Sequence, residues 1–306
     1  MEYELAIIGA GPAGFSAGIY AARSGINPIL FDRGDGGGRA VLSPRIENYA
    51  GFESISGVEL IEKMKQHASK YVQLHFYEEV KKITRSKETF LLETSKGSYT
   101  VNAILLCTGT EHKTLDIPGE QKFQGKGVSY CTTCDGFFFK GKNVAVIGGG
   151  NTALMEANFL KQIGCKEVTL IHRRDQLRAE KIIEQETRDK HIKILLNTTI
   201  EKISGGDVVE SLHLVDMVSG KKSVFPVDGV FISVGHTPQN SLAKQLGVSL
   251  DDQGYVIVDR QQRTNVKGVC AAGDITGGVN QVITAASEGA IAALSSAEIL
   301  GKKYPY

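Results

Sequence analysis

The chain has 306 residues, which is enough for two domains of ordinary size. Its 35 Lys and Arg side chains are balanced by 34 Asp and Glu side chains, so the charge does not indicate a nucleic acid or a membrane surface as a partner. No apolar run approaches membrane-spanning length, and the N-terminus lacks the regions of a signal peptide, so we expect a cytoplasmic protein.

A nucleotide-binding unit is predicted at the start of the chain. The apolar run Leu5–Ile8 favours a strand buried on both faces, and it leads directly into the GxGxxG sequence of residues 9–14. A helical pattern follows through Arg23, and a second apolar strand ends at Asp32. The glycines allow a pyrophosphate to approach the helix N-terminus, and the Asp32 carboxylate is placed to accept hydrogen bonds from ribose hydroxyls.

The next hundred residues mix one helix with several strands. Residues 36–39 have the composition of a flexible loop, and Ser56–Glu59 is a capping box that predicts a helix over Glu59–Tyr71. The predicted strands that follow are Val72–Phe76, Val80–Thr84, Phe90–Glu93 and Tyr99–Cys107.

Cys131 and Cys134 form a CxxC sequence that is followed directly by Asp135. Two cysteines at this spacing can close a small disulfide, and a thiol in such a motif is more acidic than a free one. Half of a zinc site is the alternative, but no second CxxC or histidine cluster supplies the other ligands, so we expect no metal. Asp135, which stands before Gly136, is by itself also compatible with an ordinary turn.

Residues 142–153 repeat the pattern of residues 3–14, and a helix and a second strand again follow. This copy has a glycine sequence of the GxGxxA kind. Its strand ends at His172, Arg173 and Arg174, with Arg178 further on, where the first copy has an acid. Guanidinium groups pair with a 2′-phosphate that a carboxylate would repel, so this unit should prefer NADP to NAD. A solvated basic start of a helix is the plainer alternative.

The second unit is predicted to be inserted into the first. An apolar strand that ends at Gly273-Asp274 returns the chain to the first unit, and a helix over Gln281–Leu300 closes it. Pro and Gly near 115–119 and 237–241 are suited to hinges. We therefore predict an α/β fold of two Rossmann-like units, residues 1–113 with 244–306, and residues 114–243.

Seven motifs in this order resemble the low-molecular-weight thioredoxin reductase family of flavoproteins, over essentially the whole chain. They are GAGPAG at 9–14, GG at 37–38, ENYAGF at 47–52, CTTCDGFFF at 131–139, GGGNTA at 148–153, HRRDQLRAEK at 172–181, and GVCAAGD at 268–274 with Gln281. The resemblance implies two ββα-type Rossmann domains, with FAD in the first unit and NADPH in the inserted one. It also implies a homodimer, and thioredoxin or a thioredoxin-like protein as the electron acceptor.

The resemblance implies roles for individual residues as well. Cys134 would be the sulfur beside the flavin, Cys131 the thiol that attacks the disulfide of the partner, and Asp135 the acid of the site. The implied FAD-binding residues are Gly9, Gly11, Pro12, Ala13, Gly14, Asp32, Arg33, Gly37, Gly38, Arg39, Asn48, Val80, Thr108, Gly109, Gly273, Asp274, Asn280, Gln281 and Val282. The implied NADPH-binding residues are Gly148, Gly150, Asn151, Thr152, Ala153, His172, Arg173, Arg174 and Arg178. Because the CxxC and the NADPH must each reach one flavin in the other unit, we expect the units to rotate between half-reactions.

Three residues depart from the family pattern: Arg39 replaces a usual Gln, Met155 a common acidic residue, and Asn280 a usual Arg. They leave the electron donor open between NADPH and a ferredoxin or deazaflavin, although the intact arginines of the second unit favour NADPH. A cation near a flavin would favour its anionic reduced form and so shift its potential. The other functions left open are a glutaredoxin-like or peroxiredoxin acceptor, and a flavin-bearing redox sensor.

Overall fold

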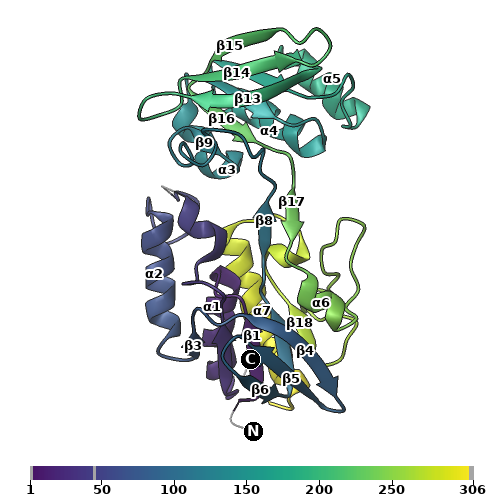
Figure 1. Cartoon of the computed structure of the whole chain (residues 1–306). Helices are drawn as coiled ribbons and strands as arrows, with labels where there is room; N and C mark the ends of the chain where they lie inside the picture. The colour runs from purple at the N-terminus through teal and green to yellow at the C-terminus, as the bar shows by residue number, and fades with distance from the viewer. Residues whose placement is uncertain (1–2, 44–45, 303–306) are drawn as a thin grey trace. The chain divides into compact units, whose positions relative to one another are not determined.

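The computed structural model describes residues 3–43 and 46–302; the first two residues, on which the signal-peptide expectation partly rests, lie outside this part. The chain separates into two units, one formed by Met1–Glu111 with Thr237–Tyr306, the other by His112–His236 (Figure 1). The predicted unit boundaries, at 113–114 and 243–244, lie slightly further along the chain than the observed ones after Glu111 and His236. Residues 115–119, predicted to lie between the units, belong to the inserted one.

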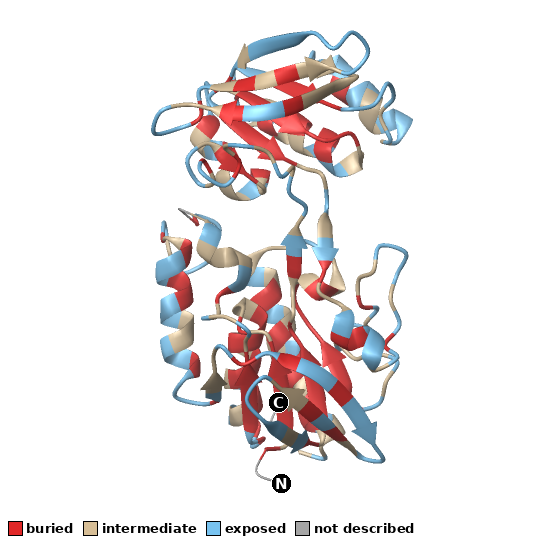
Figure 2. Cartoon of the chain, in the orientation of Figure 1, coloured by how far each residue is buried: buried red, intermediate tan, exposed pale blue. Residues whose placement is uncertain are grey.

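The discontinuous unit is built on a parallel sheet in the order β18-β7-β1-β2-β3. Its strands are β1 (Leu5–Ile8), β2 (Pro28–Phe31), β3 (Gln73–His75), β7 (Ala103–Leu106) and β18 (Val269–Ala271). The central strands are buried on both faces, as Figure 2 shows in red, which explains their continuous apolar sequences. Helices α1 (Pro12–Arg23) and α7 (Val282–Ile299) pack against each other, and α2 (Gly57–Ala68) lies beside α1.

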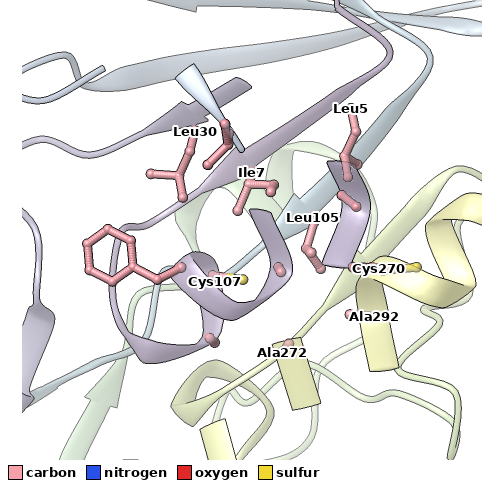
Figure 3. Close-up of a cluster of buried hydrophobic side chains, with 14 of the residues drawn as sticks. Leu5, Ile7, Leu30, Leu105, Cys107, Cys270, Ala272 and Ala292 are labelled. Atoms are coloured by element: carbon pink, nitrogen blue, oxygen red, sulfur yellow. The ribbon is translucent and has the colours of Figure 1, made fainter. Parts of the chain in front are cut away.

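The core of this unit joins the sheet to the helices. Figure 3 shows Leu5, Ile7, Leu30 and Leu105 from the strands, packed in one cluster with Ala292 of α7. By length and composition, α7 is the one helix of the described residues that could cross a membrane. That is weak evidence, because α7 packs along α1 with its alanines buried, as the core helix of a domain does.

An antiparallel sheet of β4 (Val80–Ser86), β5 (Thr89–Thr94) and β6 (Ser98–Val101) completes the unit. The prediction of one strand over Tyr99–Cys107 is wrong, because Asn102 separates β6 from β7. The backbone N–H groups of Asn102 and Ala103 both donate to the Glu4 carbonyl, and the chain changes sheets there. The predicted cap of α2 is confirmed, since the Ser56 side chain accepts a hydrogen bond from the N–H of Glu59.

The inserted unit repeats the arrangement. Its parallel sheet has the order β12-β11-β10-β16-β9, formed by β9 (Val128–Ser129), β10 (Asn143–Ile147), β11 (Glu167–Ile171), β12 (Lys193–Leu195) and β16 (Gly229–Ile232). Helices α4 (Asn151–Gln162) and α5 (Lys181–Asp189) and an antiparallel sheet of β13 (Thr198–Ser204), β14 (Ser211–Asp216) and β15 (Lys222–Pro226) complete it. β10 pairs in parallel with β11 and β16, as β1 does with β2 and β7, so the predicted repeat of two Rossmann-like units is confirmed.

Short elements connect these layers. The remaining ones are β8 (Thr110–His112), which pairs with β17 (His236–Pro238), helices α3 (Thr132–Asp135) and α6 (Ser241–Gln245), and the 3₁₀ turns η1 (Gly38–Leu42), η2 (Gly136–Phe139) and η3 (Asp274–Thr276). The predicted flexible loop at 36–39 is wrong in part, since it leads into η1 and the N–H of Gly37 donates to the Ala10 carbonyl.

Candidate active site and nucleotide sites

The CxxC sequence forms a disulfide at the start of α3. Cys131 and Cys134 are bonded, with their Cα atoms 5.3 Å apart, and both residues are partly exposed. The N–H of Cys134 points at the Cys131 sulfur, with the nitrogen and sulfur 3.2 Å apart. The disulfide is therefore open to attack by an external thiolate, and once it is reduced its own thiolate can attack an external disulfide.

Asp135 directly follows the disulfide and is largely enclosed. Its Oδ2 atom accepts a hydrogen bond of 2.6 Å from the Ser129 hydroxyl, while its buried Oδ1 has no partner among the described residues. Burial raises the pKa of the Asp135 carboxyl, and the bond from Ser129 offsets part of that rise. The arrangement favours a carboxyl that can hold a proton in the residue directly after the disulfide.

The Ser129 hydroxyl connects the acid to the disulfide, and sequence reasoning missed it. Its oxygen accepts from the N–H of Cys131 at 3.0 Å while it donates to Asp135. Ser129 ends the two-residue strand β9, which pairs with β16. A serine two residues before a CxxC carries no sequence signal, because only the pairing of β9 points its side chain at Asp135.

The first glycine loop has one position open to a ligand. A Cβ at Gly9 would lie 2.2 Å from the Cys107 carbonyl oxygen, and one at Gly14 would lie 1.9 Å from the Gly9 carbonyl oxygen. These two glycines are required by the packing of the chain itself. A Cβ at Gly11 would meet nothing within 4 Å, so the loop leaves open space at the N-terminus of α1, where a pyrophosphate fits.

Asp32 is held beside this loop. Its two carboxylate oxygens each accept a backbone N–H at 2.8 Å, one from Ala10 and one from Gly34. The carboxylate is thereby fixed with lone pairs remaining, as the binding of ribose hydroxyls requires.

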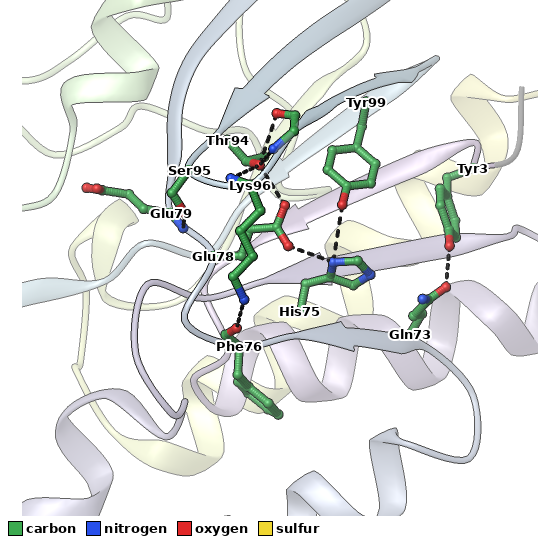
Figure 4. A network of polar contacts seen from close by, with 11 residues as sticks. Tyr3, Gln73, His75, Phe76, Glu78, Glu79, Thr94, Ser95, Lys96 and Tyr99 are labelled. Atoms are coloured by element: carbon green, nitrogen blue, oxygen red, sulfur yellow. Dashed lines mark hydrogen bonds and ion pairs between the residues drawn. The ribbon is translucent and has the colours of Figure 1, made fainter.

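Figure 4 shows a network of polar contacts around the buried Glu78, and this network adjoins the strand end that carries Asp32. Glu78 is 3% exposed and accepts from Thr94 at 2.6 Å, with the Nδ1 of His75 2.9 Å away. The backbones of these residues continue to Asp32, whose N–H donates to the His75 carbonyl and whose carbonyl accepts from the N–H of Glu78. The network therefore fixes the acid of the first nucleotide loop from the side of β3.

The carboxyl ends of β7 and β18 gather most of the other residues implied for the flavin. Arg39 Nη1 donates to Thr110 Oγ1 at 2.8 Å and lies 3.4 Å from Asp274 Oδ2. At the N-terminus of α7, Asn48 donates to the Gln281 side chain at 3.0 Å, and the Oδ1 of Asn280 is buried without a partner in the described part of the chain. A buried acceptor in this position fits a ligand with hydrogen-bond donors.

The other residues implied for FAD lie in several different parts of this unit. Pro12, Ala13 and Gly14 form the first turn of α1, and Gly37 and Gly38 lead into η1, both with positive φ. Thr108 donates to the Gln239 carbonyl at 2.7 Å, and Gly109 accepts from the N–H of the same residue. Gly273 and Val282 flank Asp274 and Gln281 in the chain. Val80 is buried in the core, and Arg33 is exposed and paired with Glu111.

The inserted unit contains a cavity of about 470 Å³ at the carboxyl ends of its strands. Its lining includes these residues implied for NADPH: Gly148, Gly150, Thr152, Ala153, His172, Arg173 and Arg178. Arg174 and Asn151 are not part of that lining; Asn151 instead bonds to Glu180 through both atoms of its amide. Lys113 and Thr198 also line the cavity, and the sequence motifs did not indicate them because they come from distant segments.

The second glycine loop matches the first. A Cβ at Gly148 would lie 2.4 Å from the Ser233 carbonyl oxygen, one at Gly149 would lie 2.3 Å from the His172 ring, and one at Gly150 would meet nothing within 4 Å. The N–H of Arg178 donates to the Gly149 carbonyl at 2.7 Å and so folds the arginine loop back over the glycines. Burial and the neighbouring arginines lower the pKa of His172, whose buried Nε2 has no partner in the described residues.

The other acidic and sulfur groups indicate no metal site. Among residues 3–43 and 46–302, no three His, Cys, Asp or Glu side chains are placed to hold a metal ion. Cys107, Cys165 and Cys270 are buried and free. Burial raises the pKa of each thiol, that of Cys270 to about 11, which disfavours the reactive thiolate form.

Comparison with known proteins places the whole chain. Residues 3–289 match the model of the pyridine nucleotide-disulphide oxidoreductases, a family whose name implies a nicotinamide cofactor and disulfide chemistry. The chain is 40% identical over 293 residues to the thioredoxin reductase of Listeria innocua, covering 95% of this chain and 91% of the relative. It is 41% identical over 302 residues to that of Treponema pallidum, covering 98% and 97%.

Solved structures agree with the sequence matches. The thioredoxin reductase of Streptococcus pyogenes superposes with a TM-score of 0.92 at 36% identity, covering 98% of each chain. The chain belongs to the pyridine nucleotide-disulphide oxidoreductase family, and within it to the thioredoxin reductases, which are flavoproteins.

Proposed function

We propose that this chain is an NADPH-dependent reductase that passes electrons through FAD and the Cys131–Cys134 disulfide to oxidised thioredoxin. The observation that carries the proposal is the partly exposed disulfide with an enclosed acid beside it, in the same unit as a nucleotide cavity. A sensor would not need that combination. When bound, the flavin supplies the carrier of an electron pair between the nicotinamide and the disulfide.

The discontinuous unit is the site proposed for FAD. The open space at Gly11 would accept the pyrophosphate at the N-terminus of α1, and the fixed carboxylate of Asp32 would bind the ribose hydroxyls of the adenosine half. The carboxylate of Asp274 and the Oδ1 atom of Asn280, which has no partner among the described residues, would accept hydrogen bonds from the flavin half. Together, these groups fit a dinucleotide.

The cavity of the inserted unit is the site proposed for NADPH. Gly150 would face the pyrophosphate, and Arg173 and Arg178 would pair with the 2′-phosphate. The pKa of His172 is lowered by burial and by the neighbouring arginines. Its Nε2 atom, which has no partner among the described residues, can donate to a phosphate oxygen when it carries the proton. We assign Arg174 a smaller role in binding the 2′-phosphate, because it does not line the cavity.

The dithiol step requires two electrons and two protons for each disulfide reduced. The electron pair breaks the Cys131–Cys134 bond. Asp135, the residue after Cys134, would supply or hold one of the two protons. We assign Cys131 as the thiolate that attacks the disulfide of thioredoxin and forms a mixed disulfide. Cys134 then attacks Cys131, which restores the internal disulfide and releases reduced thioredoxin.

The proposed reaction needs the two units to move. The disulfide and the nucleotide cavity both lie in His112–His236, whereas the flavin site lies in the other unit. Only the paired strands β8 and β17 carry the chain across, so we propose rotation about these strands between half-reactions. We further propose that the enzyme acts as a homodimer in the cytoplasm.

The test is an anaerobic titration of the purified protein, followed by the absorbance of the flavin. We expect NADPH to bleach the flavin rapidly and NADH to do so far more slowly. A protein purified without flavin would contradict the proposal. A flavin that stays oxidised with both nucleotides would instead support ferredoxin or deazaflavin as the donor, which the departures at Arg39, Met155 and Asn280 left open.

A second experiment identifies the electron acceptor. Turnover is measured with thioredoxin, with a glutaredoxin-like protein and with a peroxiredoxin as the added partner. Steady turnover with one of them identifies it as the acceptor and excludes a redox sensor.

A further inference from the structure

Three segments of the discontinuous unit converge on the guanidinium of Arg39. Arg39 comes from η1, Thr110 follows β7, and Asp274 follows β18. One guanidinium nitrogen donates to the Thr110 hydroxyl at 2.8 Å and lies 3.4 Å from the Asp274 carboxylate. The side chains of Arg39 and Asp274 are 23% and 21% exposed, so this charged pair is held largely away from solvent.

The position of the pair in the sheet places it at one end of the dinucleotide site. The strand order β18-β7-β1-β2-β3 puts Asp32, after β2, on one side of the glycine loop, and Thr110 and Asp274, after β7 and β18, on the other. A dinucleotide lies across the carboxyl ends of such strands with its pyrophosphate at the glycine loop. With the adenosine ribose at Asp32, the flavin half extends to the side where Arg39 lies.

Arg39 carries a positive charge, since arginine is not deprotonated in proteins. Burial lowers the pKa of its guanidinium, and the neighbouring Asp274 offsets part of that change. Burial raises the pKa of Asp274, and the neighbouring Arg39 offsets part of that rise, so the arginine favours the ionised carboxylate. Loss of the arginine would therefore remove a positive charge and leave a poorly compensated negative one.

We propose that Arg39 sets the redox potential of the flavin in this chain by stabilising the negative charge of its reduced form. The inference rests on the proposed function, because it requires a flavin in this unit. Uptake of two electrons and one proton leaves one negative charge on the ring system, and Arg39 itself is unchanged in the step. The potential is consequently higher with Arg39 than with a neutral side chain.

The experiment measures the flavin midpoint potential against a reference dye during titration with dithionite, which involves neither NADPH nor thioredoxin. Arg39→Gln removes the charge and keeps a polar side chain, and Arg39→Lys keeps the charge. We expect the equilibrium to shift about tenfold toward oxidised flavin in the Gln variant, the order of effect of one charge about 12 Å away at an effective dielectric constant of about 20. The Lys variant should stay close to the natural protein.

An unchanged potential in Arg39→Gln would overturn the inference while leaving the proposed function intact. A natural protein that binds no flavin would overturn the proposed function first. Asp274→Asn provides the opposite change, since it removes a negative charge and should raise the potential. If the Gln variant fails to retain its flavin, Asp274→Asn decides the question: a raised potential supports the inference, and an unchanged or lowered one contradicts it.

Discussion

The Ser129 hydroxyl lies 2.6 Å from a carboxylate oxygen of Asp135, and the other oxygen of that carboxylate is buried without a partner in the described residues. Burial raises the pKa of Asp135, and this hydrogen bond from Ser129 offsets part of the rise. The same hydroxyl accepts from the N–H of Cys131 at 3.0 Å, so the acid and the disulfide share one support.

Asp135→Asn should lower turnover with thioredoxin by about 10²–10⁴-fold, the usual contribution of a general acid. Reduction of the flavin by NADPH should persist, because it does not use this proton. Single-turnover measurements of the two half-reactions separate these effects. Equal losses in both half-reactions would contradict the assigned role.

The stability of Asp135→Asn should depend on pH in a defined direction. Because the pKa of Asp135 is raised in the folded state, its favourable contribution is complete below the ordinary pKa of an aspartate and is lost as pH rises through the raised value. The natural protein should therefore lose stability relative to the variant over that range. Thermal unfolding at pH 4 and pH 8 measures the difference, which should favour the variant more at pH 8.

Ser129→Ala should move the pH profile of dithiol-dependent turnover. Loss of the hydrogen bond raises the pKa of Asp135 further, so the protonated acid persists to higher pH and the alkaline limb shifts upward. The variant should also lose about 1–3 kcal/mol of stability, because buried polar groups lose a partner. Ser129→Thr keeps the hydroxyl and serves as the control; an identical shift in that variant would contradict the hydrogen-bond explanation.

The arginines after β11 should differ in their effect on cofactor selectivity. Arg178→Gln and Arg173→Gln should each raise the KM for NADPH about 10–100-fold, the value of a hydrogen bond to a charged group, with little change for NADH. Arg174→Gln is the matched control, because Arg174 does not line the cavity. Steady-state kinetics with both nucleotides provide the measurement. A loss as large in the control would show that the cavity lining does not identify the phosphate site.

Alanine substitutions at two glycines of the first loop, Gly11 and Gly14, should have different effects. Gly11→Ala places a Cβ in open space, so the fold should persist while the affinity for flavin falls at least about tenfold. Gly14→Ala places a Cβ 1.9 Å from the Gly9 carbonyl oxygen, so the melting temperature itself should fall. Flavin content and thermal unfolding distinguish the two outcomes. Full flavin affinity in Gly11→Ala would mean that no ligand approaches this loop closely.

The local sequence pattern correctly predicted strands that are buried on both faces and a helix whose capping residue lies close to it in the sequence. β1 and β2 read as continuous apolar runs because they are central strands, and Ser56 caps α2 through a residue three positions away. Pattern failed at Tyr99–Cys107, where one strand-like stretch of sequence covers two strands in different sheets. The break at Asn102 depends on a carbonyl at Glu4, which no local pattern contains.

The sequence by itself determined the two glycine loops, the CxxC, the arginines after the second strand and hence the family, because each of these is a short motif whose chemistry depends on residue spacing. Only the tertiary structure decided which residues of those motifs lie at a site. It enclosed Asp135 and directed Ser129 to it, separated Arg174 from the cavity that Arg173 and Arg178 line, and joined Arg39 to Asp274. These contacts join segments that meet only when the sheets form, and burial in such contacts, rather than residue type, sets the pKa of an acid and the partners of a charge.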